Sequence, residues 1–186
     1  MSRQGRRNQR DDTFAALTRE KAKRGRPRSV VPRQSVYVAL SKLQKQRISQ
    51  MAKQLPPDIK RADVPDMCVM TLQTRIEQIR RAVAGRDREL PEGITDMESL
   101  YFLWDLPLPP KHPEVTWTSM RLSPQQVLEF GRLQGTFNAL FGANRSDVFT
   151  LALMLLDQVV EKGNSAEAFP YTTLDEYSSY LSATYL

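Results

Sequence analysis

The 186-residue sequence contains few of the residues from which metal sites and disulfides are built. It has a single cysteine, Cys68, and a single histidine, His112. One cysteine cannot form an internal disulfide, and one cysteine and one histidine far apart exclude an ordinary zinc site. Because Cys68 lies inside an apolar helical run, we expect it to be a small core residue and not a reactive thiol.

The sequence also lacks long apolar runs and sets of catalytic residues. No apolar run approaches the ~20 residues of a membrane span, and no apolar stretch follows the basic N-terminus, so we expect neither a membrane segment nor a signal peptide. There is no phosphate-cradling glycine loop and no Ser/His/Asp or Cys/His set. We therefore expect a protein that is not an enzyme and needs no cofactor.

The positive charge of the chain is concentrated at its N-terminus. Residues 1–33 contain 11 Lys and Arg against 3 Asp and Glu, a net charge of +8, whereas the rest of the chain carries −2 of the total of +6. This segment has almost no periodic apolar pattern, so we expect it to be disordered when free. Basic arms of this kind usually bind nucleic acid. The alternative is a solvated tail that only aids solubility.

The remainder of the chain contains an internal repeat. Arg61-Ala62-Asp63-Val64 opens an apolar run, and Arg145-Ser146-Asp147-Val148 opens another with a constant offset of 84 (61 to 145). Upstream of each copy lies an alternating, strand-like stretch that ends in a serine, over 36–41 and 118–123. A unit of strand, helix and helix is too thin to bury its own apolar face, so we expect the two copies to pack together.

The pattern predicts the following elements and segments. Strands are expected over 35–41 and 117–122, helices over 42–55, 64–84 and 147–162 and from Pro124 onward, and one or two helical turns over 97–104. The chain then divides into a basic arm (1–33), a first copy (34–85), a proline-rich connector (86–114), a second copy (115–162) and an acidic, aromatic tail (163–186). The sequence does not place the tail.

Two alternating strands, each followed by two helices, resemble the ribbon-helix-helix family of prokaryotic DNA-binding proteins, the Arc/MetJ type. The resemblance covers about 35–84 and 115–162, and its best stretches are 120–124 and 144–148. It implies a mainly α fold with a short two-stranded antiparallel ribbon, arranged as a tandem ribbon-helix-helix pseudo-dimer within one chain. In the family, the ribbon enters the major groove of DNA and its outward side chains contact base edges.

The resemblance assigns roles to particular residues. The outward, base-reading positions would be Ser35, Tyr37, Ala39, Trp117, Ser119 and Arg121. Of these, Arg121 is the best base reader, because a guanidinium can bond guanine O6 and N7 together. The N-terminus of each second helix would lie near a phosphate, with Asp63 and Ser146 as caps and Arg61 and Arg145 beside the phosphate. The sequence also offers Asn144 as the cap of the second of these helices.

The sequence departs from the usual family pattern in three ways. The two copies are unequal and share one chain, the loops between helices are longer than usual, and Tyr37, Ala39 and Trp117 are poorer hydrogen-bonding residues than the usual polar set. An alternative is that the two strands simply pair and are covered by the connector.

A second motif lies in the basic arm. Arg24, Gly25, Arg26, Pro27 and Arg28 resemble an AT-hook, whose Gly-Arg-Pro core lies extended in the minor groove of A·T-rich DNA. The physical chemistry agrees, since proline stiffens an extended backbone, glycine permits close approach, and arginines suit the negative potential of a narrow minor groove. The alternative is generic attraction to phosphates.

Together these features predict a double-stranded DNA-binding protein, either a transcriptional repressor or regulator or an architectural factor, located in the cytoplasm with the nucleoid. It would be a monomeric pseudo-dimer or a homodimer. One alternative is an antitoxin-like or assembly-accessory protein-interaction module that binds a partner through residues 163–186. Another is binding of RNA or single strands, with Tyr37 and Trp117 as stacking platforms.

Overall fold

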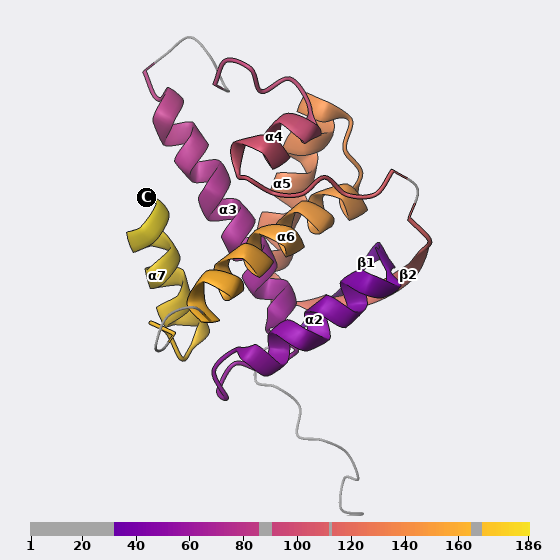
Figure 1. The fold of residues 1–186 in the computed structure, drawn as a ribbon, viewed down its shortest axis with the longest axis vertical. Coiled ribbons are helices and arrows are strands. Elements are labelled where there is room, and N and C mark those ends of the chain that lie inside the picture. The colour runs from indigo at the N-terminus through magenta and orange to yellow at the C-terminus, as the bar shows by residue number, and fades with distance from the viewer. Residues whose placement is uncertain (1–31, 86–90, 112, 165–168) are drawn as a thin grey trace, which may run out of the picture. The chain divides into compact units, whose positions relative to one another are not determined.

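The computed structural model describes residues 32–85, 91–111, 113–164 and 169–186. In these residues the chain is mainly helical with one two-stranded antiparallel sheet, so the predicted fold class is confirmed at this level (Figure 1). The elements are β1 (Gln34–Ser41), α2 (Lys42–Gln54), α3 (Val64–Val83), α4 (Met97–Leu103), β2 (Val115–Leu122), α5 (Pro124–Phe141), α6 (Arg145–Asn164) and α7 (Leu174–Tyr185). The AT-hook-like residues Arg24, Gly25, Arg26, Pro27 and Arg28 lie outside the described residues.

The two strands pair along their whole length, from Gln34 opposite Leu122 to Ser41 opposite Val115. Their apolar side chains alternate with polar ones, as the sequence predicts for a half-buried strand. The inward residues Val36, Val38, Leu40, Met120 and Leu122 are all buried against the helices. The alternation in the sequence therefore identifies the inner face of the ribbon correctly.

Local chemistry starts and ends the helices. Ser41 and Gln44 form a capping box at the start of α2, in which Ser41 Oγ accepts from Gln44 N at 3.2 Å and Gln44 Oε1 accepts from Ser41 N at 2.8 Å. Pro124 in the first turn of α5 needs no hydrogen-bond acceptor. At the other end of α5, Gly142 takes the left-handed conformation (φ 66°) that favours glycine and turns the chain toward α6.

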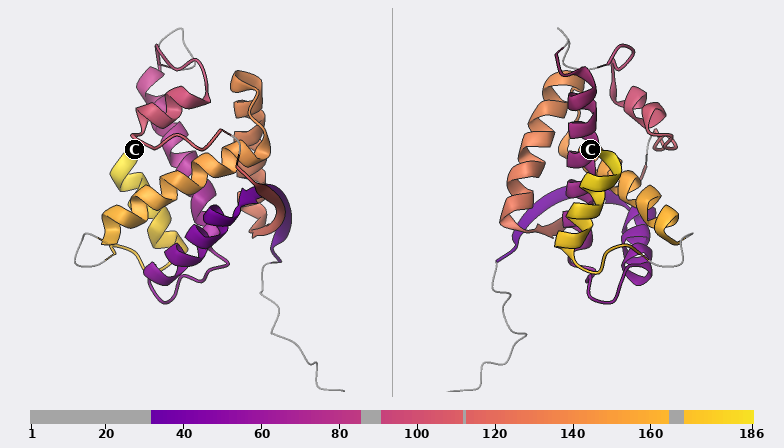
Figure 2. Two further views of the ribbon diagram at one scale, coloured as in Figure 1. Left: turned by 45° about the vertical axis from the view of Figure 1, so that its right-hand side comes forward. Right: turned by 90° about the vertical axis from the view of Figure 1, so that its left-hand side faces the viewer.

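The two long helices α3 and α6 form the centre of the folded unit. They pack against each other more extensively than any other pair of helices, and Figures 1 and 2 show them crossing near the centre of this unit. Cys68 of α3 is fully buried, as the sequence predicts. No single described helix is long and apolar enough to cross a membrane; only α5 and α6 together, bent by 110°, reach that length and composition.

The connector contributes a short helix to the core. Asp96 Oδ1 accepts from Ser99 N at 2.8 Å and starts α4, which corresponds to the predicted helical turns over 97–104. Leu100, Tyr101 and Trp104 are buried. The backbone oxygen of Trp104 accepts a hydrogen bond from Gln158 Nε2 of α6 at 2.9 Å, so α4 is fixed to the second copy.

The C-terminal tail, which the sequence does not place, belongs to the same core. Its helix α7 packs against α3, and Tyr171, Tyr177 and Leu181 are buried. The hydroxyl of Tyr177 lies 2.6 Å from Thr71 Oγ1 of α3, so the buried phenol has a polar partner. The aromatic residues of the tail thus serve as core residues.

Candidate nucleic-acid interface

The outer face of the ribbon brings together all six predicted base-reading residues. The register places Ser35 opposite Arg121, Tyr37 opposite Ser119, and Ala39 opposite Trp117. Five of these side chains are exposed, and Ala39 is half-buried. Opposed side chains on one face of an antiparallel pair lie ~4.5–5.5 Å apart at Cβ. The six residues therefore form one continuous surface, which we call the outer ribbon face.

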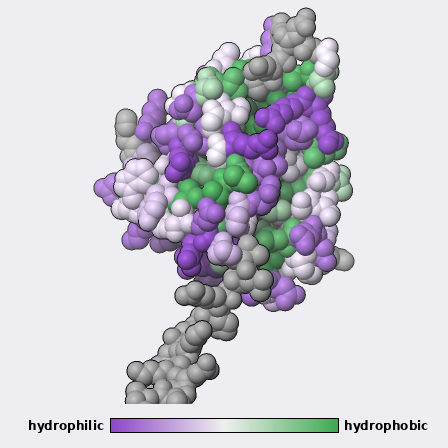
Figure 3. Space-filling view, turned by 180° about the vertical axis from the view of Figure 1, so that it is seen from behind, coloured by the Kyte–Doolittle hydropathy of each residue, from purple (hydrophilic) through white to green (hydrophobic). Residues whose placement is uncertain are grey.

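Two large aromatic side chains lie on this surface, Tyr37 in its middle pair and Trp117 in one of its end pairs. Tyr37 is 59% exposed and Trp117 is 75% exposed, and they occupy diagonal positions across the two strands. The alternative in which the connector covers the strands is therefore wrong for the outer ribbon face. Scattered exposed hydrophobic residues such as Leu43 and Leu128 occur elsewhere, and Figure 3 shows hydrophobic groups among hydrophilic ones on the side of the molecule turned away from the view of Figure 1.

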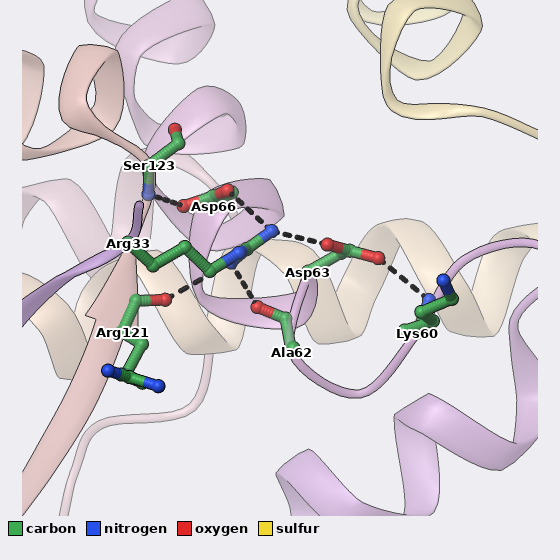
Figure 4. A network of polar contacts seen from close by, with 7 residues as sticks. All are labelled: Arg33, Lys60, Ala62, Asp63, Asp66, Arg121 and Ser123. Atoms are coloured by element: carbon green, nitrogen blue, oxygen red, sulfur yellow. Dashed lines mark hydrogen bonds and ion pairs between the residues drawn. The ribbon is translucent and has the colours of Figure 1, made fainter. Parts of the chain in front are cut away.

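Arg121 provides the cationic group of the outer ribbon face. Its backbone oxygen accepts a hydrogen bond from Arg33 Nη1 at 3.1 Å, whereas its side chain points away from the neighbouring carboxylates (Figure 4). Within the described part of the chain, no hydrogen bond or ion pair engages its guanidinium. The backbone of Arg121 is thus fixed and its guanidinium is free to bind a ligand.

The side chain of Asp63 at the start of α3 is engaged elsewhere. Asp63 is the N-cap residue of this helix, as the sequence predicts, but its side chain makes no capping hydrogen bond. Its Oδ2 accepts from Lys60 N at 2.8 Å, and its Oδ1 is paired with Arg33 Nη2. The carboxylate of Asp63 thus binds Arg33, 30 residues away in the sequence, and does not bind the free N–H groups of its own helix.

A buried carboxylate lies beside this pair. Asp66 is only 1% exposed; its Oδ1 accepts from Ser123 N at 2.9 Å and its Oδ2 lies 3.1 Å from Arg33 Nη2. Burial raises the pKa of Asp66, and the hydrogen bond from Ser123 and the charge of Arg33 act in the opposite direction. Arg33 also donates to the backbone oxygen of Ala62, so one guanidinium joins both strands' ends to α3 (Figure 4).

Sequence reasoning missed Arg33, because composition groups it with the basic arm. In the structure its side chain is 19% exposed and belongs to the folded unit. The only sequence signal is its place immediately before the first predicted strand.

The start of α6 is built differently. Asn144 Oδ1 accepts from Ser146 N at 2.8 Å and from Asp147 N at 3.1 Å, so of the two predicted caps Asn144 caps this helix and Ser146 does not. Instead, Ser146 Oγ accepts from the backbone N–H of Ala39 at 2.8 Å and joins α6 to β1. Because Asn144 is the cap, α6 begins at Arg145, two residues before the predicted start.

The two predicted phosphate-binding arginines are available. Arg61 and Arg145 are exposed, and within the described ranges neither side chain has a hydrogen-bond or ion-pair partner. Their contact with phosphate stays a prediction. Among the described residues, no group of His, Cys, Asp or Glu side chains could hold a metal ion.

Comparison of the chain with protein-family models, with curated proteins and with solved structures finds no match. The assignment of a function therefore depends on the residues and geometry given above.

Proposed function

We propose that this chain is a double-stranded DNA-binding protein that inserts the β1–β2 ribbon into the major groove, as its resemblance to ribbon-helix-helix proteins implies. The observation that supports the proposal most is the outer ribbon face. It presents exposed polar, aromatic and cationic side chains from both strands, while the apolar residues of the inner face are buried against the helices. The major groove is about 12 Å wide and admits a two-stranded ribbon.

The strand register supports a tandem pseudo-dimer within one chain. Tyr37 lies four residues before Ser41, and Ser119 lies four residues before Ser123, the residues that precede α2 and α5. Tyr37 and Ser119 are paired across the ribbon. The two strands are therefore related by an approximate two-fold axis through this pair, and the second helices of the two copies, α3 and α6, pack behind it.

The basic groups outside the ribbon would supply sequence-independent affinity. Arg61 and Arg145 are placed at the starts of α3 and α6, and the arm ahead of Arg33 carries a net charge of +7 over residues 1–32 (10 Lys and Arg against 3 Asp and Glu). Neutralised phosphates release counterions, so binding should weaken steeply with salt. The biological role that follows is that of a transcriptional repressor or regulator, or of an architectural DNA-binding factor.

The test is fluorescence anisotropy across a salt series, with a duplex enriched from a random library and a scrambled duplex of equal length. Arg121→Ala should weaken binding to the enriched duplex by about 1–3 kcal/mol and leave the scrambled duplex unaffected. The matched control is Arg80→Ala, because Arg80 is exposed at the end of α3 remote from the ribbon (Figure 1). Equal losses on both duplexes would refute base reading by Arg121.

A second candidate function is supported by the exposure of Tyr37 (59%) and Trp117 (75%). Aromatic side chains that stack on unpaired bases contribute about 1–3 kcal/mol per base. Competition between duplex and single strand separates the two functions: a single-strand binder prefers the unpaired competitor, and Trp117→Ala removes that preference.

The protein-interaction alternative, in which residues 163–186 bind a partner, has a structural cost. Tyr171, Tyr177 and Leu181 lie in the core, and they would have to leave it to contact a partner.

A further inference from the structure

We infer that the DNA site of this protein is non-palindromic and is bound in a single orientation. The inference depends on the proposed function, since it concerns the same outer ribbon face. A homodimeric ribbon repeats the same side chains about its two-fold axis and therefore matches a palindromic site. The question is whether equivalent positions of this ribbon hold equivalent residues.

They hold different residues at every outward position. Counted back from Ser41 and Ser123, Ser35 corresponds to Trp117, Tyr37 to Ser119, and Ala39 to Arg121. Each correspondence joins side chains of different chemistry: a hydroxyl and an indole, a phenol and a hydroxyl, a methyl and a guanidinium. The backbone of the ribbon is thus approximately two-fold symmetric, and the surface that it presents is not.

The asymmetry gives the ribbon two chemically distinct ends. At the end where Gln34 pairs with Leu122, the outward residues are Ser35 and Arg121, which bond to base edges, and arginine favours guanine. Toward the other end the outward pair is Ala39 and Trp117, which offers apolar contact of the kind that suits the methyl group of thymine. The site should therefore have a guanine on one side and thymine on the other.

The hydrogen bonds that join the two ends of the ribbon to the helices differ as well. Ala62 and Ser146 are equivalent in the sequence repeat. Ser146 Oγ bonds directly to Ala39 N at 2.8 Å, whereas Ala62 has no hydroxyl and is connected to Arg121 through the guanidinium of Arg33 (Figure 4). The fold itself therefore distinguishes the Arg121 end from the Ala39 end.

The experiment is selection of bound duplexes from a random library with the full chain, followed by sequencing. We expect a non-palindromic site with a guanine on one side and thymine on the other. Arg121→Ala should lose the guanine and keep the thymine. The double variant R121A/A39R moves the guanidinium to the equivalent position, so the guanine should move to the other end of the site.

Enrichment of a palindrome, or of two inverted half-sites, would overturn the inference and leave the proposed function intact. Absence of any enriched duplex would overturn both. A guanine that stays in place in R121A would also overturn the inference, and this single variant gives that answer even if the double variant does not fold. Arg80→Ala serves as the control and should enrich the same site as the unaltered chain.

Discussion

Replacing Arg33 by alanine should destabilise the fold more than any other single change of a charged residue near the ribbon. The guanidinium of Arg33 pairs with Asp63 and Asp66 and donates to the backbone oxygens of Ala62 and Arg121. Asp66 is 1% exposed, and its Oδ2 accepts no hydrogen bond of its own, so it depends on the ion pair with Arg33 at 3.1 Å. The variant leaves this carboxylate oxygen buried and uncompensated.

The size of the effect follows from the burial of the partners. Removing one member of a fully buried ion pair costs about 3–5 kcal/mol. Arg33 and Asp63 are 19% and 17% exposed, and water screens their part of the interaction. We therefore expect Arg33→Ala to lower the free energy of unfolding by about 2–3 kcal/mol, a large part of the ~5–15 kcal/mol typical of a domain. Near the melting temperature this corresponds to a decrease of roughly 4–12 °C.

The assay is chemical denaturation at pH 7, followed by circular dichroism. Arg80→Ala is the control, because Arg80 is 60% exposed and its pair with Glu77 is long at 4.0 Å, so its loss should cost less than about 0.5 kcal/mol. The double variant R33A/D66N removes the orphaned charge and keeps an oxygen for the N–H of Ser123, so it should be more stable than R33A. The reasoning is refuted if R33A unfolds within about 0.5 kcal/mol of the unaltered chain, or if D66N does not restore stability in the R33A background.

Three further measurements test the packing of buried residues. Tyr177→Phe, which removes the 2.6 Å bond to Thr71, should cost about 1 kcal/mol and Tyr177→Ala about 3–5 kcal/mol in denaturant titrations; an unaltered stability in Y177A would contradict the burial of the tail. Burial raises the pKa of the Cys68 thiol, so a disulfide reagent should modify it only as fast as the chain unfolds, and fast labelling of the native protein would show that Cys68 is accessible. Burial also raises the pKa of Asp66 above its unfolded value, so protonation favours the folded state: as the pH falls from 7 through the folded-state pKa, the unaltered chain should gain stability relative to D66N, and a pH-independent difference would argue against the shift.

The sequence predicted what depends on local pattern. Alternation along 35–41 and 117–122 identified which side chains face outward, and the strand register places all six predicted base-reading side chains on one face. Runs of apolar residues at helical spacing predicted α3 and its buried Cys68. Ser41 and Ser123, which are typical cap residues, predicted where α2 and α5 begin. These features are set by residues close together in the chain.

The predictions failed where a distant partner competes with a local one. Asp63 precedes a helix, as a cap does, but its carboxylate binds Arg33. Ser146 also lies at a helix start, but its hydroxyl accepts from Ala39 N, 107 residues away, and Asn144 provides the cap. Sequence spacing cannot reveal such contacts, because they depend on how the two copies pack.

The tail was unplaced for a different reason. Its buried side chains include Tyr171 and Tyr177, whose hydroxyls make them amphipathic, so its apolar period is weak. Only the position of Thr71 on α3 shows why a tyrosine is suitable there, since the two hydroxyls bond to each other.

The central claim is that the outer ribbon face contacts DNA, and Trp117 reports on it directly. The chain has two tryptophans, of which Trp104 is 5% exposed and Trp117 is 75% exposed. In a Trp104→Phe variant, shown by circular dichroism to be folded, all tryptophan emission comes from the ribbon. Acrylamide should quench this emission strongly in the free protein and much less in the presence of saturating enriched duplex. Trp117 emission that is quenched equally with and without bound duplex would contradict the claim, because DNA would then bind elsewhere on the molecule.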